Sequence, residues 1–290
     1  RIDEKKVRER SKRFHDHFSK ERLFYVSQSK HKQNQRVDEL SFEMGHLETE
    51  AVRIRVVGLL TQIDGDLAAR VADNLGLKVP SKPEQPINQS YGADTKPKDV
   101  QPVFVQQNVE TSPALSMANT IKNTIKTRQV AILATSGADD DSIMEMKAAL
   151  EAQGAVVKIV SMKLGTFKTT SGENVKADQA FLGSSSVLFD AIFIPGGEAS
   201  VNALKSKPEA ILFINETYRH CKAIAATGEA IDLLSSTFAG EKINGEGDNS
   251  LTSLGIITAQ KFDQKVATSF INAIAQHRFW EREDMSKVPA

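Results

Sequence analysis

The chain has 290 residues, enough for two domains of ordinary size, and its 37 basic and 37 acidic residues cancel to a formal net charge of zero. This balance excludes a protein-wide electrostatic attraction to nucleic acid or to an anionic membrane, and no apolar run approaches the roughly 18–20 residues that a membrane-spanning helix needs. Cys221 is the only cysteine, so no internal disulfide can form. We therefore expect a cytoplasmic protein that binds neither nucleic acid nor a membrane.

The first residues are locally basic. Residues 1–36 contain twelve Lys or Arg and five Asp or Glu. This stretch is either a patch for an acidic partner or another subunit, or the solvated face of a helix, and the pattern favours the solvated face. The sequence begins in a charged, helix-like stretch without an initiator Met or a signal-peptide pattern, so we expect a fragment or a processed form of a longer protein.

Residues 1–77 are predicted to form a helical segment, because their apolar residues are spaced three and four apart. The apolar positions include Val37, Leu40, Met44, Val52, Val56, Leu59, Ile63, Leu67, Val71 and Leu75. Gly65 and Gly76 are predicted to lie where one helix ends and the next begins. Short helices with one apolar face cannot bury that face as separate rods, so they must pack on one another or on a partner.

Residues 78–127 are predicted to form an extended connector. Six of the nine prolines of the chain lie between residues 78 and 113, among Gln, Asn, Lys and Ser. Proline fixes φ and lacks a backbone donor, which opposes both helix and sheet. A structureless segment of this length either joins two independent domains or runs along a surface that holds it in place.

Residues 128–290 alternate short apolar strands with amphipathic helices. The predicted strands are residues 130–134, 156–160, 191–194, 223–226 and 255–258. Strands with few polar residues, separated by helices, indicate a parallel sheet that is covered on both faces. With right-handed crossovers, the fold class is α/β, a doubly wound sheet of the flavodoxin-like kind.

Polar sequences follow three of these strands at the edge where such sheets hold their ligands. Three consecutive aspartates begin at Asp139, and they suggest a metal site, an acid or the capping of a helix. The pattern favours capping. Gly196 and Gly197 can present backbone N–H groups to an oxyanion or a phosphate, although paired glycines also end strands for purely conformational reasons.

The third sequence has the composition of a nucleophile elbow, the tight turn that lifts a reactive side chain above a sheet. Ala226 stands where the nucleophile belongs and has no reactive atom, and Thr227 and Gly228 follow it. Thr227 carries a hydroxyl, but no base lies at a recognisable spacing. Cys221 lies five residues before the elbow and is expected to be buried and inert.

The six histidines show no zinc-binding spacing, so we predict no metal site and interpret all six as surface or packing residues.

Taken together, the chain resembles the C-terminal portion of the large-subunit haem catalases. The matching stretches, in collinear order, are residues 10–14 (RSKRF), 16–19, 23–24, 37–43, 53–57, 67–72, 112–117, 177–178, 186–191 with 194–197, and 275–280 (AQHRFW). The resemblance implies that residues 1–77 are the helical end of the catalase body, residues 78–127 a wrapping connector, and residues 128–290 an additional terminal domain.

The terminal domain is similar to the class I glutamine amidotransferase-like superfamily, which includes the PfpI-type peptidases. The resemblance places the elbow cysteine of those enzymes at Ala226, their acidic partner near Asp139, and their oxyanion loop at Gly196 and Gly197. Ala226 and the shorter acid depart from the enzyme pattern. They imply a vestigial pocket without hydrolase chemistry, and a role in stability, assembly or chaperone-like binding of unfolded clients.

For the full-length protein, the resemblance implies a homotetramer that uses haem to convert hydrogen peroxide into water and oxygen. The catalase core of the same polypeptide would hold the haem-pocket residues upstream of this chain, since Tyr25, Tyr91 and Tyr218 stand in unrelated contexts. We expect no cofactor in this chain alone. The alternatives are a PfpI-like hydrolase or glyoxalase-type enzyme that uses Cys221 or Thr227, and a nucleotide- or flavin-binding module without a G-x-G-x-x-G turn.

Overall fold

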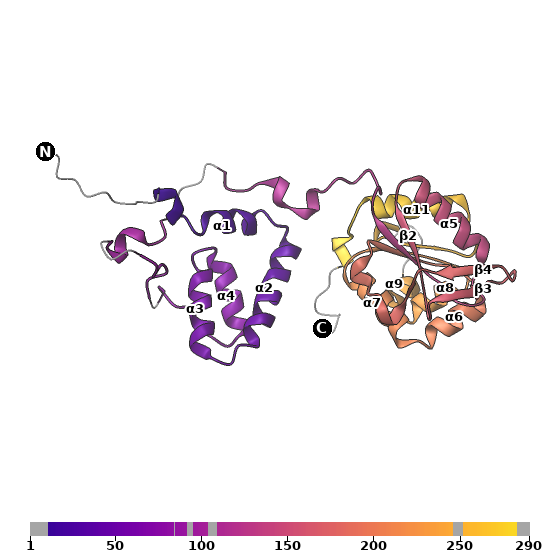
Figure 1. Ribbon diagram of the computed structural model, residues 1–290, viewed down its shortest axis with the longest axis horizontal. Helices are drawn as coiled ribbons and strands as arrows, with labels where there is room; N and C mark the ends of the chain where they lie inside the picture. Colours follow the sequence, from indigo (N-terminus) through magenta and orange to yellow (C-terminus); the bar gives the residue numbers. More distant parts are fainter. Residues whose placement is uncertain (1–10, 84, 92–94, 104–108, 246–251, 283–290) are drawn as a thin grey trace. The chain divides into compact units, whose positions relative to one another are not determined.

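The computed structural model describes residues 11–83, 85–91, 95–103, 109–245 and 252–282. The chain divides into two compact units, Arg1–Thr120 and Ile121–Ala290 (Figure 1). The first unit is helical, and the second alternates strands with helices. Within the described ranges, no helix has both the length and the apolar composition required to cross a membrane.

The helical unit begins with a series of short helices. They are η1 (Lys12–His15), α1 (Ser19–Val26), α2 (Lys30–Gly45), α3 (Glu50–Leu60) and α4 (Gly65–Asn74). The Asp64 carboxylate accepts hydrogen bonds from the backbone N–H groups of Asp66 and Leu67, at 3.0 and 3.1 Å. Asp64 therefore caps α4, and Gly65, the first residue of α4, lies at the predicted boundary between two helices. Gly76, with a φ of +65°, does follow the end of α4.

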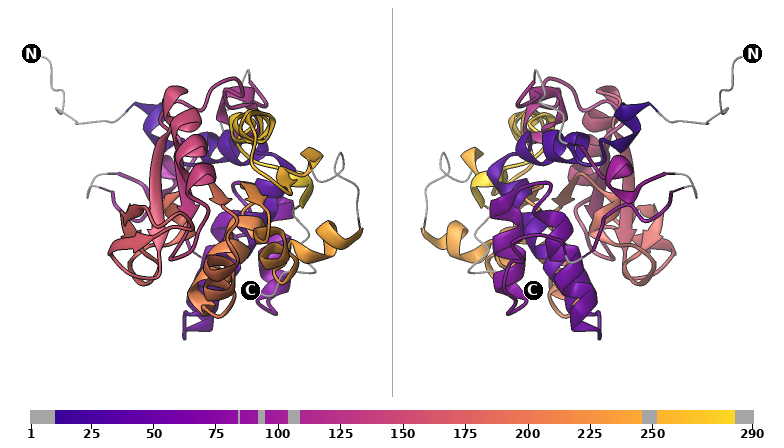
Figure 2. Two further views of the ribbon diagram at one scale, coloured as in Figure 1. Left: turned by 90° about the vertical axis from the view of Figure 1, so that its right-hand side faces the viewer. Right: turned by 90° about the vertical axis from the view of Figure 1, so that its left-hand side faces the viewer.

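The core of this unit forms where α4 packs against both α2 and α3. These helices lie side by side in Figure 1 and in the right-hand view of Figure 2. The buried side chains are Tyr25, Val37, Met44, Val57, Leu60, Leu67, Ala68, Val71 and Ala72. The apolar faces that the spacing predicts therefore bury partly against one another.

The connector continues the helical unit with three short 3₁₀ turns, η2 (Pro97–Val100), η3 (Pro113–Leu115) and η4 (Met117–Asn119). Its backbone is bonded to the helical segment at several points. The N–H of Val103 donates to the carbonyl of His15 at 2.9 Å, and the N–H of Ser112 donates to Ser27 Oγ at 2.8 Å. Of the two alternatives for the connector, these contacts correspond to a segment that runs along a surface and is held there.

The α/β unit contains a six-stranded sheet in the order β5-β2-β1-β6-β7-β8. The strands are β1 (Gln129–Leu133), β2 (Val156–Ser161), β5 (Gln179–Ala180), β6 (Ala191–Ile194), β7 (Ala223–Thr227) and β8 (Ile256–Ala259). Each neighbouring pair is parallel. This sheet confirms the predicted α/β fold class.

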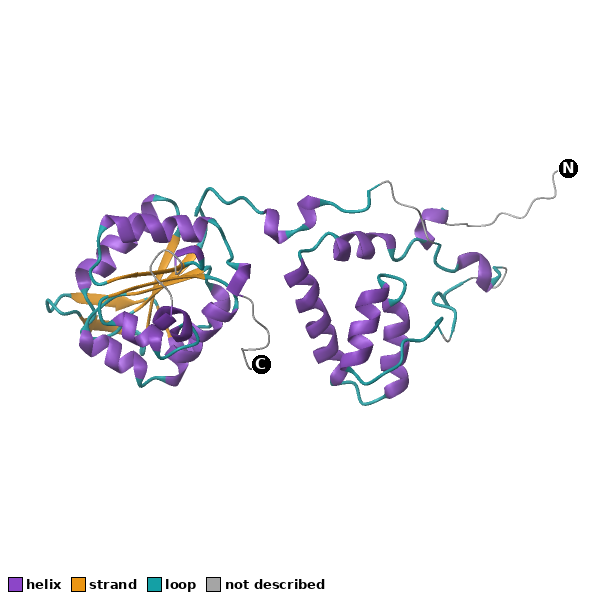
Figure 3. Ribbon diagram, turned by 180° about the vertical axis from the view of Figure 1, so that it is seen from behind, coloured by secondary structure: helices purple, strands orange, loops and turns teal. Residues whose placement is uncertain are grey.

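Helices cover both faces of the sheet (Figure 3). They are α5 (Asp140–Ala152), α6 (Glu198–Lys205), α7 (Pro208–Arg219), α8 (Ala230–Ser235), α9 (Gly240–Gly245) and α11 (Gln264–Ala275). Val130 and Ile132 of β1 belong to a core cluster with side chains of α5 and α11. Ala131 and Leu133, which point the other way, belong to a second cluster with side chains of α6, α7 and α8.

An antiparallel hairpin, β3 (Gly165–Lys168) with β4 (Asn174–Ala177), follows β2 and was not predicted. Three further 3₁₀ turns, η5 (Phe181–Gly183), η6 (Ser186–Leu188) and η7 (Trp280–Arg282), complete the described elements of the unit.

Candidate functional site

The loops that follow β1 and β6 touch at the C-terminal edge of the sheet. The backbone N–H of Asp139 donates to the carbonyl of Gly196 at 2.9 Å. A Cβ on Gly197 would lie 2.2 Å from the carbonyl oxygen of Gly137, and Gly197 has a φ of +111°. Only glycine fits at position 197, because any side chain would collide with the neighbouring loop and strain the backbone.

The turn after β7 closes against the same glycines. The N–H of Gly196 donates to Thr227 Oγ1 at 3.2 Å, and the N–H of Gly197 donates to Glu229 Oε2 at 2.9 Å. The N–H of Gly228 donates to the carbonyl of Ala259 at 2.9 Å, which ties the turn to β8. The structure therefore brings the predicted residues of all three loops together.

The two N–H groups predicted to bind an oxyanion already donate to side chains of this chain. The hydrogen bond from the Gly197 N–H is the main reason why the pKa of the Glu229 carboxyl lies below its usual range. The carboxylate of Glu229 thus takes the position at Gly197 that a bound anion would need. Sequence reasoning did not select Glu229, although it stands directly after Gly228.

The structure differs from the predicted elbow at Ala226. Ala226 lies inside β7, where it pairs with Ile194 of β6 and Thr258 of β8, and its exposed fraction is 0%. Its methyl group belongs to the apolar cluster beneath α6 to α8. Among the described residues, the positive φ of this turn falls on Gly228, at +57°. The chain therefore turns two residues later, and nothing is lifted above the sheet at position 226.

The three aspartates lie at the start of a helix as predicted, with Asp139 at the N-cap position and Asp140 and Asp141 in the first turn of α5. Asp139 precedes α5, but its side chain makes no capping hydrogen bond to the helix backbone and instead accepts one from Ser142 Oγ. The capping prediction is therefore wrong for this side chain. The Asp140 carboxylate accepts from Thr170 Oγ1 at 3.2 Å and from Ser171 Oγ at 2.9 Å, both in the β3–β4 hairpin. The Ser171 hydroxyl is the main cause that lowers the pKa of Asp140.

Cys221 and Thr227 lie at opposite ends of β7. Cys221 comes just before the strand, is 1% exposed, and its Sγ donates to the carbonyl of Arg219 at 3.7 Å. A strand of this length separates the two side chains by about 20 Å, so they cannot act on one substrate atom. In the described part of the chain, no group of three or more His, Cys, Asp or Glu side chains could hold a metal ion.

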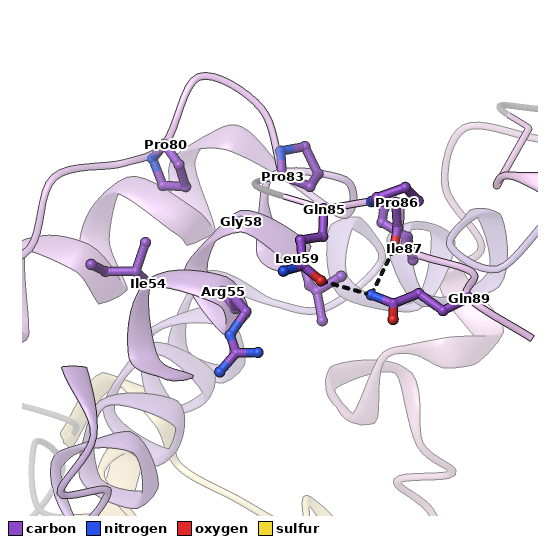
Figure 4. Close-up of a pocket in the computed structure, with 10 residues that line it drawn as sticks. All are labelled: Ile54, Arg55, Gly58, Leu59, Pro80, Pro83, Gln85, Pro86, Ile87 and Gln89. Carbon is purple, nitrogen blue, oxygen red and sulfur yellow. Dashed lines mark hydrogen bonds between the residues drawn. The ribbon is translucent and has the colours of Figure 1, made fainter. Parts of the chain in front are cut away.

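A cavity of about 160 Å³ lies in the helical unit, between α3 and the connector (Figure 4). Apolar groups, among them Ile54 and Pro80, form much of its wall. Gln89 Nε2 donates to Gln85 Oε1 at 3.0 Å, so these two amides satisfy each other at the rim. Among the described residues that line the cavity, Arg55 alone is charged. These described residues offer no arrangement of groups for acid–base or nucleophilic chemistry.

Comparison with known proteins finds catalase families that match both units. A family model described as the C-terminal domain found in long catalases matches residues 126–284, and one described as catalase-related immune-responsive matches residues 11–75. Catalase-2 of Bacillus subtilis is 34% identical over 284 residues, 97% of this chain and 36% of that protein. Catalase HPII of Pseudomonas putida is 35% identical (100% and 37%), and catalase HPII of Mycobacterium avium is 32% identical (100% and 39%). The chain thus spans less than two fifths of the length of these relatives.

Proposed function

This chain belongs to the long catalases, and from that membership we propose that it is the C-terminal part of a haem catalase, whose full-length protein converts two molecules of hydrogen peroxide into two of water and one of oxygen. The observation that carries this proposal is that catalases match the chain along almost its whole length, while the chain spans only 36–39% of theirs. The peroxide chemistry would belong to the remainder of the protein.

The described tyrosines do not fit a haem iron. An iron-bound tyrosinate must be deprotonated and open to the metal, whereas burial raises the pKa of Tyr25 inside the helical core. Tyr218 is 7% exposed and lies under the guanidinium of Arg282, with 4.9 Å between the guanidinium carbon and the ring centroid. Tyr91 is 46% exposed in the connector. We therefore assign no haem ligand to the residues that the structure describes.

The α/β unit would serve stability or assembly rather than catalysis. Two features support this role: Ala226 has no reactive atom and is enclosed in β7, and Glu229 occupies the Gly197 N–H. An oxyanion-stabilising N–H must be free to bind the charge that develops on a substrate. Here the Gly197 N–H already donates to the Glu229 carboxylate. The loops would therefore close this edge of the sheet to a substrate.

The helical unit would pack against the catalase core of the same polypeptide within a homotetramer. Phe14, Phe24 and Phe42 are 64, 41 and 67% exposed, and a groove of about 540 Å³ runs past Phe24, Leu40 and other apolar side chains. Exposed apolar surface of this kind is typical of a contact surface. Binding of unfolded clients is the alternative use of the same surface.

The test compares this 290-residue chain with the longer protein that contains it. We expect the longer protein to show the Soret band of haem and to release oxygen from peroxide, measured with an oxygen electrode. The 290-residue chain should do neither after incubation with haem. Haem binding together with rapid oxygen release by the 290-residue chain would overturn the proposal, as would a longer protein that lacks both properties.

A further inference from the structure

One face of the six-stranded sheet carries a group of exposed apolar side chains. The helices α6, α7 and α8 cover this face, and α5 and α11 cover the other (Figure 1). The exposed side chains lie on η5, η6, α7 and the loop before α9. They are Leu182, Val187, Leu188, Leu212 and Phe238, which are 77, 74, 50, 59 and 38% exposed. Among the described residues of α5 and α11, Met144 is the one large apolar side chain that is comparably exposed, at 58%.

The segments that carry these five side chains are all packed against α7. The ring centroid of Phe213, on α7, lies 5.9 Å from that of Phe181 in η5 and 5.8 Å from that of Phe189, directly after η6. The backbone N–H of Phe238 donates to Oδ1 of Asn215, also on α7, at 2.9 Å. The five exposed side chains therefore form one continuous apolar surface, which we call the α7 face.

The charged residues of α7 neutralise one another. From residue 207 to residue 219 the chain contains two bases and two acids. Lys207 Nζ lies 3.2 Å from Glu209 Oε2 at the start of the helix, and Arg219 Nη1 lies 3.8 Å from Glu216 Oε1 near its end. This helix therefore has no net charge that would attract nucleic acid, an anionic membrane or a strongly charged protein. A second copy of the same helix would approach it without net repulsion.

The α7 face has the size of a contact surface. From the exposed fractions above, its five side chains leave on the order of 500 Å² of apolar surface in water, at the upper end of the range for a monomeric protein. In a standard interface each partner buries about 800 Å², of which about 450 Å² is apolar. The apolar area of this face is therefore about what one partner contributes to a stable dimer.

We propose that the α7 face pairs with the α7 face of a second copy of this chain, about a two-fold axis that passes close to Leu212. In such an isologous pair one surface patch meets itself, so a single apolar surface is sufficient. Leu212 is placed near the axis because it lies on α7, the helix that all the other segments of the face contact. The pairing deepens the assembly role proposed for the α/β unit and rests on that role.

Sedimentation equilibrium of the 290-residue chain over the micromolar concentration range tests the pairing. We expect a monomer–dimer equilibrium. Leu212→Glu should raise its dissociation constant by a factor of about 100 or more, because two carboxylates would then face each other across the axis. Met144→Glu is the matched control, since Met144 is 58% and Leu212 59% exposed, and it should leave the constant unchanged. A chain that stays monomeric, or equal effects of the two variants, would overturn the proposal.

Cysteine cross-linking tests the position of the axis. Leu212→Cys should form a covalent dimer under mild oxidation, because a residue beside a two-fold axis lies close to its own copy. Met144→Cys is the control and should not. The native Cys221 is 1% exposed, and the unmodified chain gives the background. Equal cross-linking at positions 212 and 144 would reflect random collisions and would overturn the proposal.

Two further variants distinguish this pairing from other uses of apolar surface. If Phe42→Glu in the helical unit abolishes the association and Leu212→Glu does not, the contact lies in the helical unit and the proposal is wrong. If Leu212→Glu in the longer protein keeps the oligomeric state but lowers the melting temperature, the face packs within one polypeptide, which would also overturn the proposal. None of these measurements depends on haem or peroxide, so failure of the pairing is distinct from failure of the proposed catalase function.

Discussion

The two units of the chain bury their aromatic side chains to very different extents. Phe193 and Phe270 in the α/β unit are 0% exposed, between a sheet and the helices on its face. Phe14 and Phe42 in the helical unit are 64 and 67% exposed. The α/β unit therefore encloses these two rings in its own core, whereas the helical unit leaves two of its phenylalanine rings largely uncovered. A unit of the second kind gains much of its stability from whatever it packs against.

The strongest test of this comparison is to separate the units. We expect residues 121–290 to fold alone with one cooperative thermal transition, because both faces of the sheet are covered within that segment. Residues 1–120 should show little cooperative unfolding and should associate at high concentration. Circular dichroism and sedimentation velocity measure both outcomes. If residues 1–120 were monomeric and unfolded in one sharp transition, the conclusion that this unit depends on a packing partner for its stability would be wrong.

Matched truncations of two phenylalanines measure the same difference within the intact chain. Phe193→Ala should destabilise the α/β unit by about 3–5 kcal/mol, because it removes a buried aromatic ring and leaves a cavity. Phe42→Ala should change the free energy of unfolding by less than about 0.5 kcal/mol, because its ring is already largely in water. Denaturant titration of both variants gives the values. Equal losses would contradict the contrast in burial.

The closed loops of the α/β unit predict a smaller, pH-dependent effect. Folding lowers the pKa of Glu229, so its contribution to stability is present above the unfolded pKa and is lost as the pH falls from about 5 through the lowered value. Glu229→Gln should lower the free energy of unfolding by about 0.5–1 kcal/mol at pH 7. This is less than a buried hydrogen bond to a charged group contributes, because the Glu229 side chain is exposed to solvent. The difference between the variant and the parent should narrow as the pH falls through the lowered pKa. A difference that does not narrow at any acid pH at which both proteins stay folded would show that the carboxylate charge is not responsible.

The smallest expected effect is at Cys221. Because its thiol is 1% exposed, it should react with iodoacetamide much more slowly than a free thiol at the same pH, and denaturant should abolish the protection. Mass spectrometry of timed samples gives the rates. A native thiol that reacts faster than a free one would revive the alternative of a cysteine-dependent enzyme.

The parallel sheet could be predicted because each of its longer strands is a short apolar stretch of sequence between predicted helices. Residues 191–194 were predicted as a strand and coincide with β6. The hairpin β3–β4 could not be found in this way, since each strand has only four residues, of which one is buried in β3 and two are buried in β4. Such a pattern is also that of an ordinary polar loop.

The loop contacts of the candidate site were harder to predict. The sequence places glycines and small polar residues at the ends of three strands, and these loops do meet. It gives no information on which acceptor each backbone N–H finds, because that depends on the spacing between strands distant in sequence. Glu229 therefore escaped selection, the hairpin partners of Asp140 were not predicted, and the turn was expected at Ala226 rather than at Gly228.

Position 226 also bears on how this edge of the sheet could change over evolutionary time. A single replacement, Ala226→Cys, would place a thiol inside an apolar cluster at a site that is 0% exposed, where burial favours its protonated form. The Gly197 donor would still be bound to Glu229. Hydrolytic chemistry at this edge would thus require at least two further events, the release of that donor and a shift of the turn toward the strand. Ala226→Cys alone therefore gives this edge no reactive thiol.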